Sequence, residues 1–177
     1  DSLATGWSDP GRPPEVIEIG LAMYAFEDRQ PRRTIACFVR PRLNPELSAY
    51  CRRLGGIPQS AIDDAPRLPD VIPRLTAWLR QFSPGTPTCG WGPIDRDFVA
   101  QDATRSARPC PFGGRPHANV RALCESVLGR DPGSRDSLRA EWQLAANARR
   151  HRALDDAVDM VQFVIRVRGF AGSSRNA

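Results

Sequence analysis

Apolar residues are densest near the amino end of the chain, in a run that is typical of a β-strand. The segment from Glu15 to Phe26 reads EVIEIGLAMYAF and is rich in β-branched and other apolar residues. A second segment, from Thr34 to Arg40, roughly alternates apolar and polar positions. A charged, proline-containing stretch separates the two segments. We therefore expect them to pair as two strands joined by a hairpin connection.

Farther along, the apolar positions recur with the period of an α-helix. From Leu68 to Phe82, six apolar side chains fall on one helical face, although Pro73 would strain such a helix. Residues 41–66 are irregular and punctuated by proline and glycine, with room for short helical turns. Four more helices are expected: one from about Asp95, then Val120–Leu128, Ser137–Ala148 and Ala153–Val167.

One more short strand completes the set of expected elements. Thr86 to Trp91 lies between proline and glycine, and its pattern indicates a buried strand. Strands first, followed by mixed strand and helix, favour the α/β fold class. A chain of 177 residues fits a single domain. We expect this domain to span residues 1–170, with residues 171–177 as a loose tail.

Composition is that of an ordinary globular protein, with 41% hydrophobic and 25% charged residues. The net charge is +5, and all 25 basic residues are arginine. Excess positive charge favours anionic partners such as nucleic acid, and arginine grips phosphate in a bidentate fork. Charge alone carries little weight, since a biased genome produces the same enrichment.

The sequence also indicates the cellular compartment of the protein and the chemical state of its cysteines. No apolar run approaches the roughly 20 residues that cross a bilayer, and residues 1–14 lack the apolar core of a secretory signal. We therefore expect a cytoplasmic protein with no membrane partner. The five cysteines are odd in number, spread widely and without a C-x-x-C pair, so ordinary thiols are expected rather than disulfides or a zinc site. The oligomeric state is unknown from the sequence.

Three acidic clusters stand where strands end or helices begin. The first is DSLAT, from Asp1 to Thr5, just ahead of the first long strand. The second, GWGPID, ends at Asp95 and follows the short buried strand. The third, HRALDDA, starts at His151 and opens the last helix. Carboxylates from separate elements are suited to converge on hard divalent cations such as Mg²⁺.

This arrangement suits metal-assisted cleavage of phosphodiesters. Two divalent cations about 4 Å apart stabilise both the attacking and the leaving oxygen of an in-line displacement. A histidine beside the cations can take the proton from the attacking water. Asp156 near a helix N-terminus, with His151 on the loop before it, would direct both groups toward one cleft.

Five motifs in order resemble those of a known family. The segments PPEVIEIGLAMY, LSAYCRRLGGIPQSAIDDAP, GWGPIDRDF, PFGGRPHANVRAL and HRALDDA follow one another as they do in DEDDh 3′→5′ exonucleases of the proofreading-subunit superfamily. Within that family the chain is most similar to the enhanced-RNAi-type branch, whose members trim 3′ ends of RNA. The resemblance covers residues 1 to about 167. It implies a ribonuclease-H-like fold, a mixed β-sheet flanked by helices on both faces.

The resemblance also implies roles for four residues. Asp1 matches the first-motif aspartate that bridges both metals, and Asp95 matches the second-motif aspartate. Asp156 matches the last metal-binding aspartate, and His151 matches the general base. The implied cofactors are two ions of Mg²⁺ or Mn²⁺. The strand that carries the first motif is expected to begin before Asp1.

The first motif departs from the family pattern at its third position. The pattern is Asp-x-Glu, whereas this chain has Leu3, which cannot donate to a cation. Three explanations are open. The protein is a weakened or inactive relative, another acid such as Glu18 or Asp9 substitutes, or the start of this sequence differs from that of the natural chain.

Several neighbours of these motifs admit two interpretations. Asp97 rivals Asp95, although the Gly-Trp-Gly lead-in favours Asp95. Glu18 lies inside an apolar strand and is expected to be a buried, hydrogen-bonded partner rather than a cleft acid. Trp91 is expected to pack in the core rather than to stack on a base. His117 is expected to cap or pack, and Asn119 to be an N-cap. The run from Arg149 to Arg152 is equally consistent with a phosphate contact and with a solvated helix boundary.

Three functions are compatible with these observations. The first is a metal-dependent 3′→5′ exonuclease that acts on single-stranded RNA or DNA 3′ ends, weakened by Leu3. The alternative is a catalytically inactive, nuclease-like module that binds nucleic acid or a protein partner. A third possibility is a hydrolase of small phosphodiesters on the same scaffold.

Overall fold

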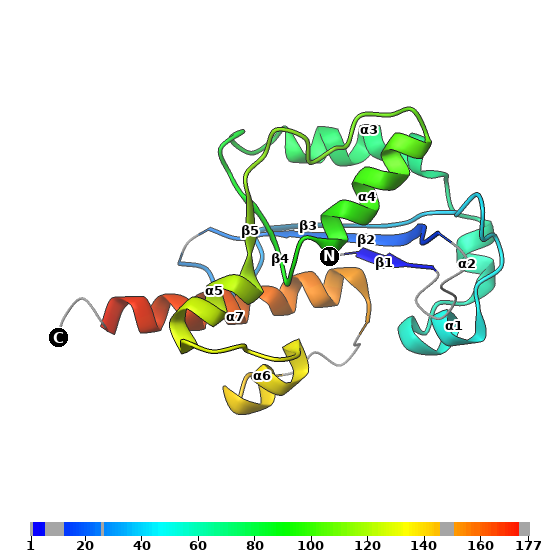
Figure 1. The fold of residues 1–177 in the computed structure, drawn as a ribbon. Coiled ribbons are helices and arrows are strands. Elements are labelled where there is room, and N and C mark those ends of the chain that lie inside the picture. Colours follow the sequence, from blue (N-terminus) through cyan, green and yellow to red (C-terminus); the bar gives the residue numbers. More distant parts are fainter. Residues whose placement is uncertain (1, 6–12, 26, 146–150, 174–177) are drawn as a thin grey trace.

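The apolar run after Pro14 forms the central strand of a three-stranded sheet. The computed structural model describes residues 2–5, 13–25, 27–145 and 151–173. In it, β2 (Val16–Met23) pairs antiparallel with β1 (Ser2–Ala4) on one side and β3 (Arg33–Phe38) on the other (Figure 1). Leu3 lies opposite Glu18, and a register shift follows between Leu3 and Ala4. The expected hairpin is confirmed, with shorter strands than the apolar run suggested.

A second pair of strands is parallel. β4 (Thr88–Gly90) lies within the segment expected to be a buried strand, and it pairs with β5 (His117–Asn119). The sequence HAN is short and polar, so β5 carries no strand pattern of its own. Asn119 ends β5 and caps the next helix, because its side chain accepts a hydrogen bond from the Ala122 amide at 3.1 Å. The expected N-cap is confirmed.

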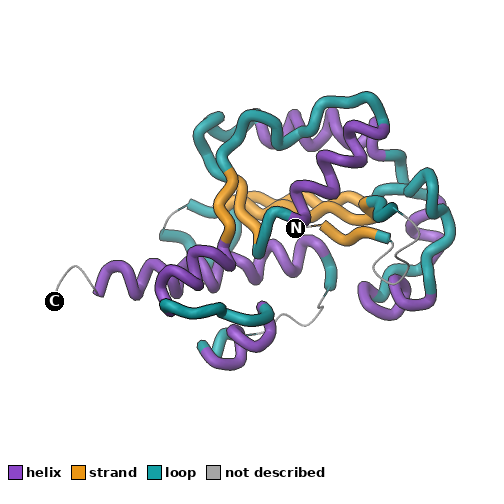
Figure 2. The backbone as a smooth tube through the Cα atoms, viewed as in Figure 1, coloured by secondary structure: helices purple, strands orange, loops and turns teal. Residues whose placement is uncertain are grey.

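The helices surround the strands in two layers. α3 and α4 pack on one face of the three-stranded sheet, while α7 packs on the other and is joined there by α5 (Figures 1 and 2). Helices of the described residues are α1 (Ala49–Gly55), α2 (Gln59–Asp63), α3 (Leu68–Leu79), α4 (Ile94–Arg105), α5 (Val120–Leu128), α6 (Arg135–Glu141) and α7 (Ala153–Ser173). The α/β class, with helices on both faces of the strands, is confirmed.

The buried apolar residues form three clusters. One joins β2 and β3 to α3 and α4, with Leu75 and Val99 at its centre. A second joins α5, α6 and α7 around Phe163, which is fully buried. Trp91 contributes to this second cluster, because its ring meets Phe163 edge-on with centroids 5.2 Å apart. Trp91 therefore packs in the core, as expected. The third cluster holds α1 and α2 against Ile17.

Several helix ends differ from the sequence prediction, and α3 already ends at Leu79 rather than at Phe82. α6 begins at Arg135, because the Ser134 side chain caps it by accepting from the Ser137 amide at 3.1 Å. It ends at Glu141, and Gln143 then adopts a left-handed backbone with φ of 53°. The helix predicted for Ser137–Ala148 was thus wrong at both ends. α7 continues to Ser173, so residues 171–173 of the expected loose tail are helical.

Among the described residues, no helix has the length and apolar character needed to cross a membrane. All five cysteines are free thiols.

Candidate active site

Asp95 stands in the first turn of α4, directly after β4 and the turn that follows it. α4 packs against β1 and β2, which holds its amino end beside the sheet. A Cβ built on Gly90 would lie 3.6 Å from Oδ2 of Asp95, so the carboxylate lies close to the end of β4. Asp97 is exposed, whereas Asp95 is half-buried. This difference favours Asp95 over its rival.

Asp156 and His151 lie at the amino end of α7. Asp156 is in the first turn, buried to 9% exposure, and its Oδ2 pairs with Nη2 of Arg135 at 2.9 Å. His151 is half-buried in the turn before the helix and has a left-handed backbone with φ of 59°. Histidine is one of the few residues besides glycine that adopts this conformation with any frequency.

A second arginine–aspartate pair joins the same two helices one turn farther along. Arg139 of α6 contacts Asp159 of α7 at 2.7 Å, and both side chains are buried. Burial raises the pKa of the Asp159 carboxyl, and the Arg139 charge offsets part of that rise. α6 therefore supplies a positive charge to each of two successive turns of α7.

Glu18 joins the centre of the sheet to the start of α7. Its buried carboxylate accepts hydrogen bonds from Nε and Nη2 of Arg152 at 3.1 and 2.8 Å, and from the Ala153 amide at 3.1 Å. The guanidinium of Arg152 also lies over the Phe38 ring, 5.3 Å from its centroid. Glu18 is thus a buried, hydrogen-bonded partner, as expected. It holds the residue that directly follows His151.

Close packing at Gly20 supports the same junction. A Cβ on Gly20 would overlap the backbone of Ala153 and Leu154. α7 therefore approaches β2 backbone to backbone, which only glycine permits at this position. Gly20 and Glu18 together fix where α7 begins.

The first motif lies beside this junction. Leu3 is in β1, opposite Glu18 in the register of the sheet. Asp1 and Asp9 lie outside the described residues, as do Arg149 and Arg150. The explanation that Glu18 substitutes for the missing glutamate is not supported, because Arg152 and the Ala153 amide already hold its carboxylate.

The acids present suit a divalent cation in type but are few in number. Asp95 and Asp156 are carboxylates at the amino ends of two helices that pack on the same sheet. Within the described ranges, no group of three or more His, Cys, Asp or Glu side chains is arranged to hold a metal ion. Asp1, the third acid expected from the sequence, lies outside those ranges.

His117, the second histidine of the chain, is held at both ring nitrogens. Its Nδ1 lies 3.2 Å from Oγ1 of Thr88, and its Nε2 lies 3.3 Å from the carbonyl oxygen of Gly92. These contacts tie β5 to β4 and to the turn before α4. They support the expected packing role and leave His151 as the better candidate for a base.

A comparison with protein-family models matches residues 4–163 to the family described as Exonuclease. The chain belongs to the exonuclease family. The match begins at Ala4, the last residue of β1, and includes all of α4 and the first half of α7. It therefore covers the elements that carry Asp95, His151 and Asp156.

Known exonucleases resemble the chain in sequence and fold. The 3′-5′ exonuclease eri1 of Schizosaccharomyces pombe is 26% identical over 176 residues, which cover 85% of this chain and 59% of that protein. The nuclease domain of 3′hExo, a DEDDh family member bound to rAMP, superimposes with a TM-score of 0.82 at 23% identity, covering 96% of this chain and 89% of that one. A 3′-exonuclease that recognises the histone mRNA stem-loop gives a TM-score of 0.80 at 22% identity, covering 96% and 61%.

The solved structures show that the chain has the fold of these exonuclease domains. The chain spans about three fifths of the length of the fission-yeast relative. Sequence reasoning placed the motifs of this exonuclease domain but missed the residues that hold them together. Arg152 is 134 residues from Glu18, and Arg135 belongs to a helix with no family motif. The only advance signal was an acid inside an apolar strand.

Proposed function

We propose that this domain is a metal-dependent 3′→5′ exonuclease that removes nucleotides from the 3′ ends of single-stranded RNA or DNA. The observation that carries the proposal is the placement of Asp95 and Asp156 in an exonuclease-family fold. Both lie in the first turns of helices that pack on the same three-stranded sheet, α4 on one face and α7 on the other. The positive ends of the helix dipoles favour carboxylates there. The fission-yeast relative is itself named a 3′-5′ exonuclease.

Asp1, Asp95 and Asp156 would hold two Mg²⁺ or Mn²⁺ ions. Such ions, when bound, lower the pKa of a bound water and neutralise charge on the phosphate during in-line displacement. The carboxylates contribute negative charge and oxygen donors, which hard divalent cations prefer. Arg135 balances the charge of Asp156 and holds its side chain at 2.9 Å.

His151 would accept the proton of the attacking water on its imidazole. Its position depends on the residue that follows it, since Arg152 is bound through two of its nitrogens by Glu18. Glu18 and Arg152 are positioning residues in this scheme. They direct the turn that carries the base without touching the substrate.

Leu3 is expected to lower the rate, because one of the family's carboxylates is absent at that position. The alternative of a module that binds without cleaving draws its main support from Leu3. The similar proteins of known name are nucleases, and this favours cleavage.

A trimming assay tests the proposal. A 5′-labelled single-stranded oligonucleotide is incubated with the protein in Mn²⁺, in Mg²⁺ and in EDTA, and the products are resolved by length. We expect a ladder that shortens from the 3′ end and requires metal. Asp156→Asn should reduce cleavage to the level seen in EDTA, whereas the exposed control Asp131→Asn should cleave as wild type. Equal cleavage by Asp156→Asn and wild type would refute the site.

A further inference from the structure

A cavity lies at the opposite end of α4 from Asp95. Its volume is about 330 Å³, and it is formed where the start of β2, the loop after β3, the start of α3 and the end of α4 meet. Four arginines from these segments line it: Arg40, Arg42, Arg67 and Arg105. The carboxylates that line it belong to Glu15 and Asp102. The cavity thus combines four positive side chains with two negative ones.

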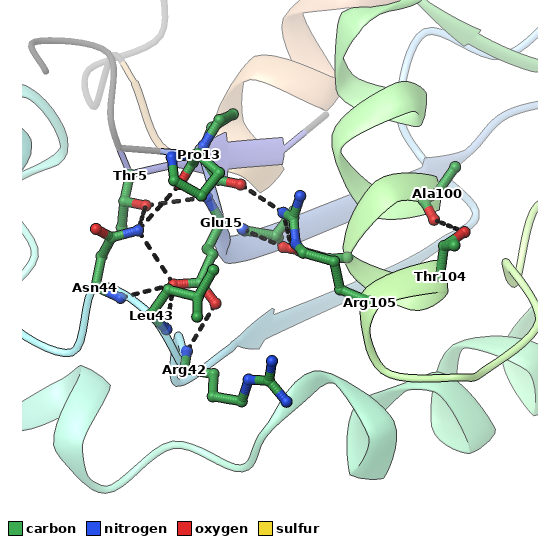
Figure 3. Close-up of polar contacts among 12 residues, drawn as sticks. Thr5, Pro13, Glu15, Arg42, Leu43, Asn44, Ala100, Thr104 and Arg105 are labelled. Carbon is green, nitrogen blue, oxygen red and sulfur yellow. Dashed lines mark hydrogen bonds and ion pairs between the residues drawn. The ribbon is translucent and has the colours of Figure 1, made fainter. Parts of the chain in front are cut away.

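Both acids are engaged within the protein. The carboxylate of Glu15, at 6% exposure, accepts hydrogen bonds from the successive backbone amides of residues 42–44 at 2.8, 2.7 and 2.7 Å (Figure 3). Asp102, at 7% exposure, accepts from the Val16 amide at 2.6 Å and pairs with Arg105. Arg105 also donates to the carbonyl oxygen of Pro14 at 2.6 Å. These hydrogen bonds hold the backbone segments that form the walls of the cavity.

The remaining arginines have no acidic partner among the residues that the structure describes. Arg42 and Arg67 are exposed, and no described residue pairs with either guanidinium. Figure 3 shows the Arg42 side chain extending away from Glu15, although its backbone amide points toward that carboxylate. Within the described part of the chain, the Arg40 guanidinium donates to a neutral group, the carbonyl oxygen of Asp63, at 3.1 Å. Among the described residues, the positive charge of Arg40, Arg42 and Arg67 at this cavity therefore has no acidic partner.

We propose that this cavity anchors backbone phosphates of the nucleic-acid strand whose 3′ end occupies the active site. The inference rests on the proposed function for the identity of that strand. Arg105 lies ten positions after Asp95 in α4, which is about 15 Å at the helical rise per residue. A strand longer than a few nucleotides can reach that far. A guanidinium group can donate two parallel hydrogen bonds to the oxygens of one phosphate. Exposed arginines at the mouth of a cavity are therefore suited to bind a phosphate.

In this proposal the exposed arginines contact the phosphates of the strand, whose charge is the same at every nucleotide. The anchor should therefore strengthen binding of long strands of any sequence and leave very short ones unaffected. Each phosphate contact made by a cation releases counterions, so it also contributes to the salt dependence of binding.

The test measures binding in EDTA, where no cleavage occurs, to a fluorescent 20-nucleotide strand and to a dinucleotide over a range of salt. Arg42→Ala combined with Arg67→Ala is compared with Arg29→Ala combined with Arg80→Ala. The control pair removes the same charge from exposed sites, in the hairpin turn and at the far end of α3. For the cavity pair we expect the slope of log K against log salt on the 20-mer to become shallower by about 1.4, since each single-strand contact contributes about 0.7.

Binding of the dinucleotide should be the same in all variants. Equal losses on the 20-mer for both pairs would show a net-charge effect and overturn the proposal, as would an equal loss on the dinucleotide. Inorganic phosphate alone should compete weakly; competition as effective as that of the 20-mer would assign the cavity to a free anion instead. Binding is measured without metal, so the two proposals can fail separately. If the protein binds the 20-mer as expected but does not cleave it in the trimming assay, the exonuclease proposal is refuted and the proposed phosphate anchor stands.

Discussion

Replacing Glu18 by glutamine removes the charge of a buried carboxylate while keeping its shape. Three hydrogen-bond donors depend on that carboxylate: Nε and Nη2 of Arg152 and the Ala153 amide, at 2.8 to 3.1 Å. Removing one partner of a buried ion pair costs about 3–5 kcal/mol, and a hydrogen bond to a charged group about 1.5–3 kcal/mol. The side chain of Arg152 is 25% exposed, so water recovers part of the loss. We expect a loss of about 2 kcal/mol in the free energy of unfolding.

Urea unfolding followed by circular dichroism measures this loss. With a slope near 2 kcal/mol/M, the midpoint should fall by about 1 M. Glu141→Gln is the matched control, because Glu141 also pairs with an arginine, Arg130, but both side chains are about half-exposed. That change should cost less than about 1 kcal/mol.

The same variant separates positioning from simple stability. At a temperature where it is fully folded, Glu18→Gln should cleave roughly 10–100-fold more slowly, with kcat reduced and KM nearly unchanged, because the turn carrying His151 is displaced while substrate contacts persist. A Glu18→Gln protein as stable and as active as Glu141→Gln would refute the reasoning. A loss confined to KM would show that Glu18 acts on substrate binding instead.

Further expectations concern the packing and the thiols. Gly20→Ala should destabilise the fold by at least about 3 kcal/mol, since its Cβ overlaps backbone that cannot rotate away. The control Gly169→Ala places its Cβ in open space on a helix and should be neutral or slightly stabilising. Thermal melts of the two variants measure the difference. Burial raises the pKa of the Cys124 thiol to about 11 from an ordinary 9.0. The folded state therefore holds this proton more tightly than the unfolded state, so the contribution is complete below pH 9 and is lost as the pH rises toward 11 and beyond. Between pH 8 and 10.5, wild type should lose about 2 kcal/mol more than Cys124→Ala in urea unfolding, and parallel losses in the two proteins would argue against a buried thiol.

The periodicity of apolar residues predicted most of the helices and strands. The strand around Ile19 and the helices at Leu68 and Val120 have strong apolar patterns, and their positions were predicted within a few residues. β5 was missed because three polar-to-small residues become a strand only by pairing with β4. The end of α6 was missed because it depends on the backbone of Gln143, which no residue preference marks.

The sequence predicted the motifs of the candidate site. It did not predict the ion pairs that hold those motifs in place. Asp95, His151 and Asp156 stand in patterns that a single sequence displays, and they remain predictions until activity is measured. The hydrogen bonds of Glu18 with Arg152 and the ion pair of Asp156 with Arg135 join residues that are far apart in the chain. Such contacts follow from the tertiary fold, so no spacing along the sequence announces them.

The most direct measurement is the rate of metal-dependent 3′-end shortening in wild type and in Leu3→Glu. If this domain is an exonuclease that lacks one carboxylate, restoring it should raise the rate with Mn²⁺ by at least about tenfold, the lower end of what even outer-shell ligand partners contribute. The change should leave strand binding in EDTA unaltered. Tight binding with no shortening of the 3′ end in either protein would contradict the assignment and identify a module that binds without cleaving.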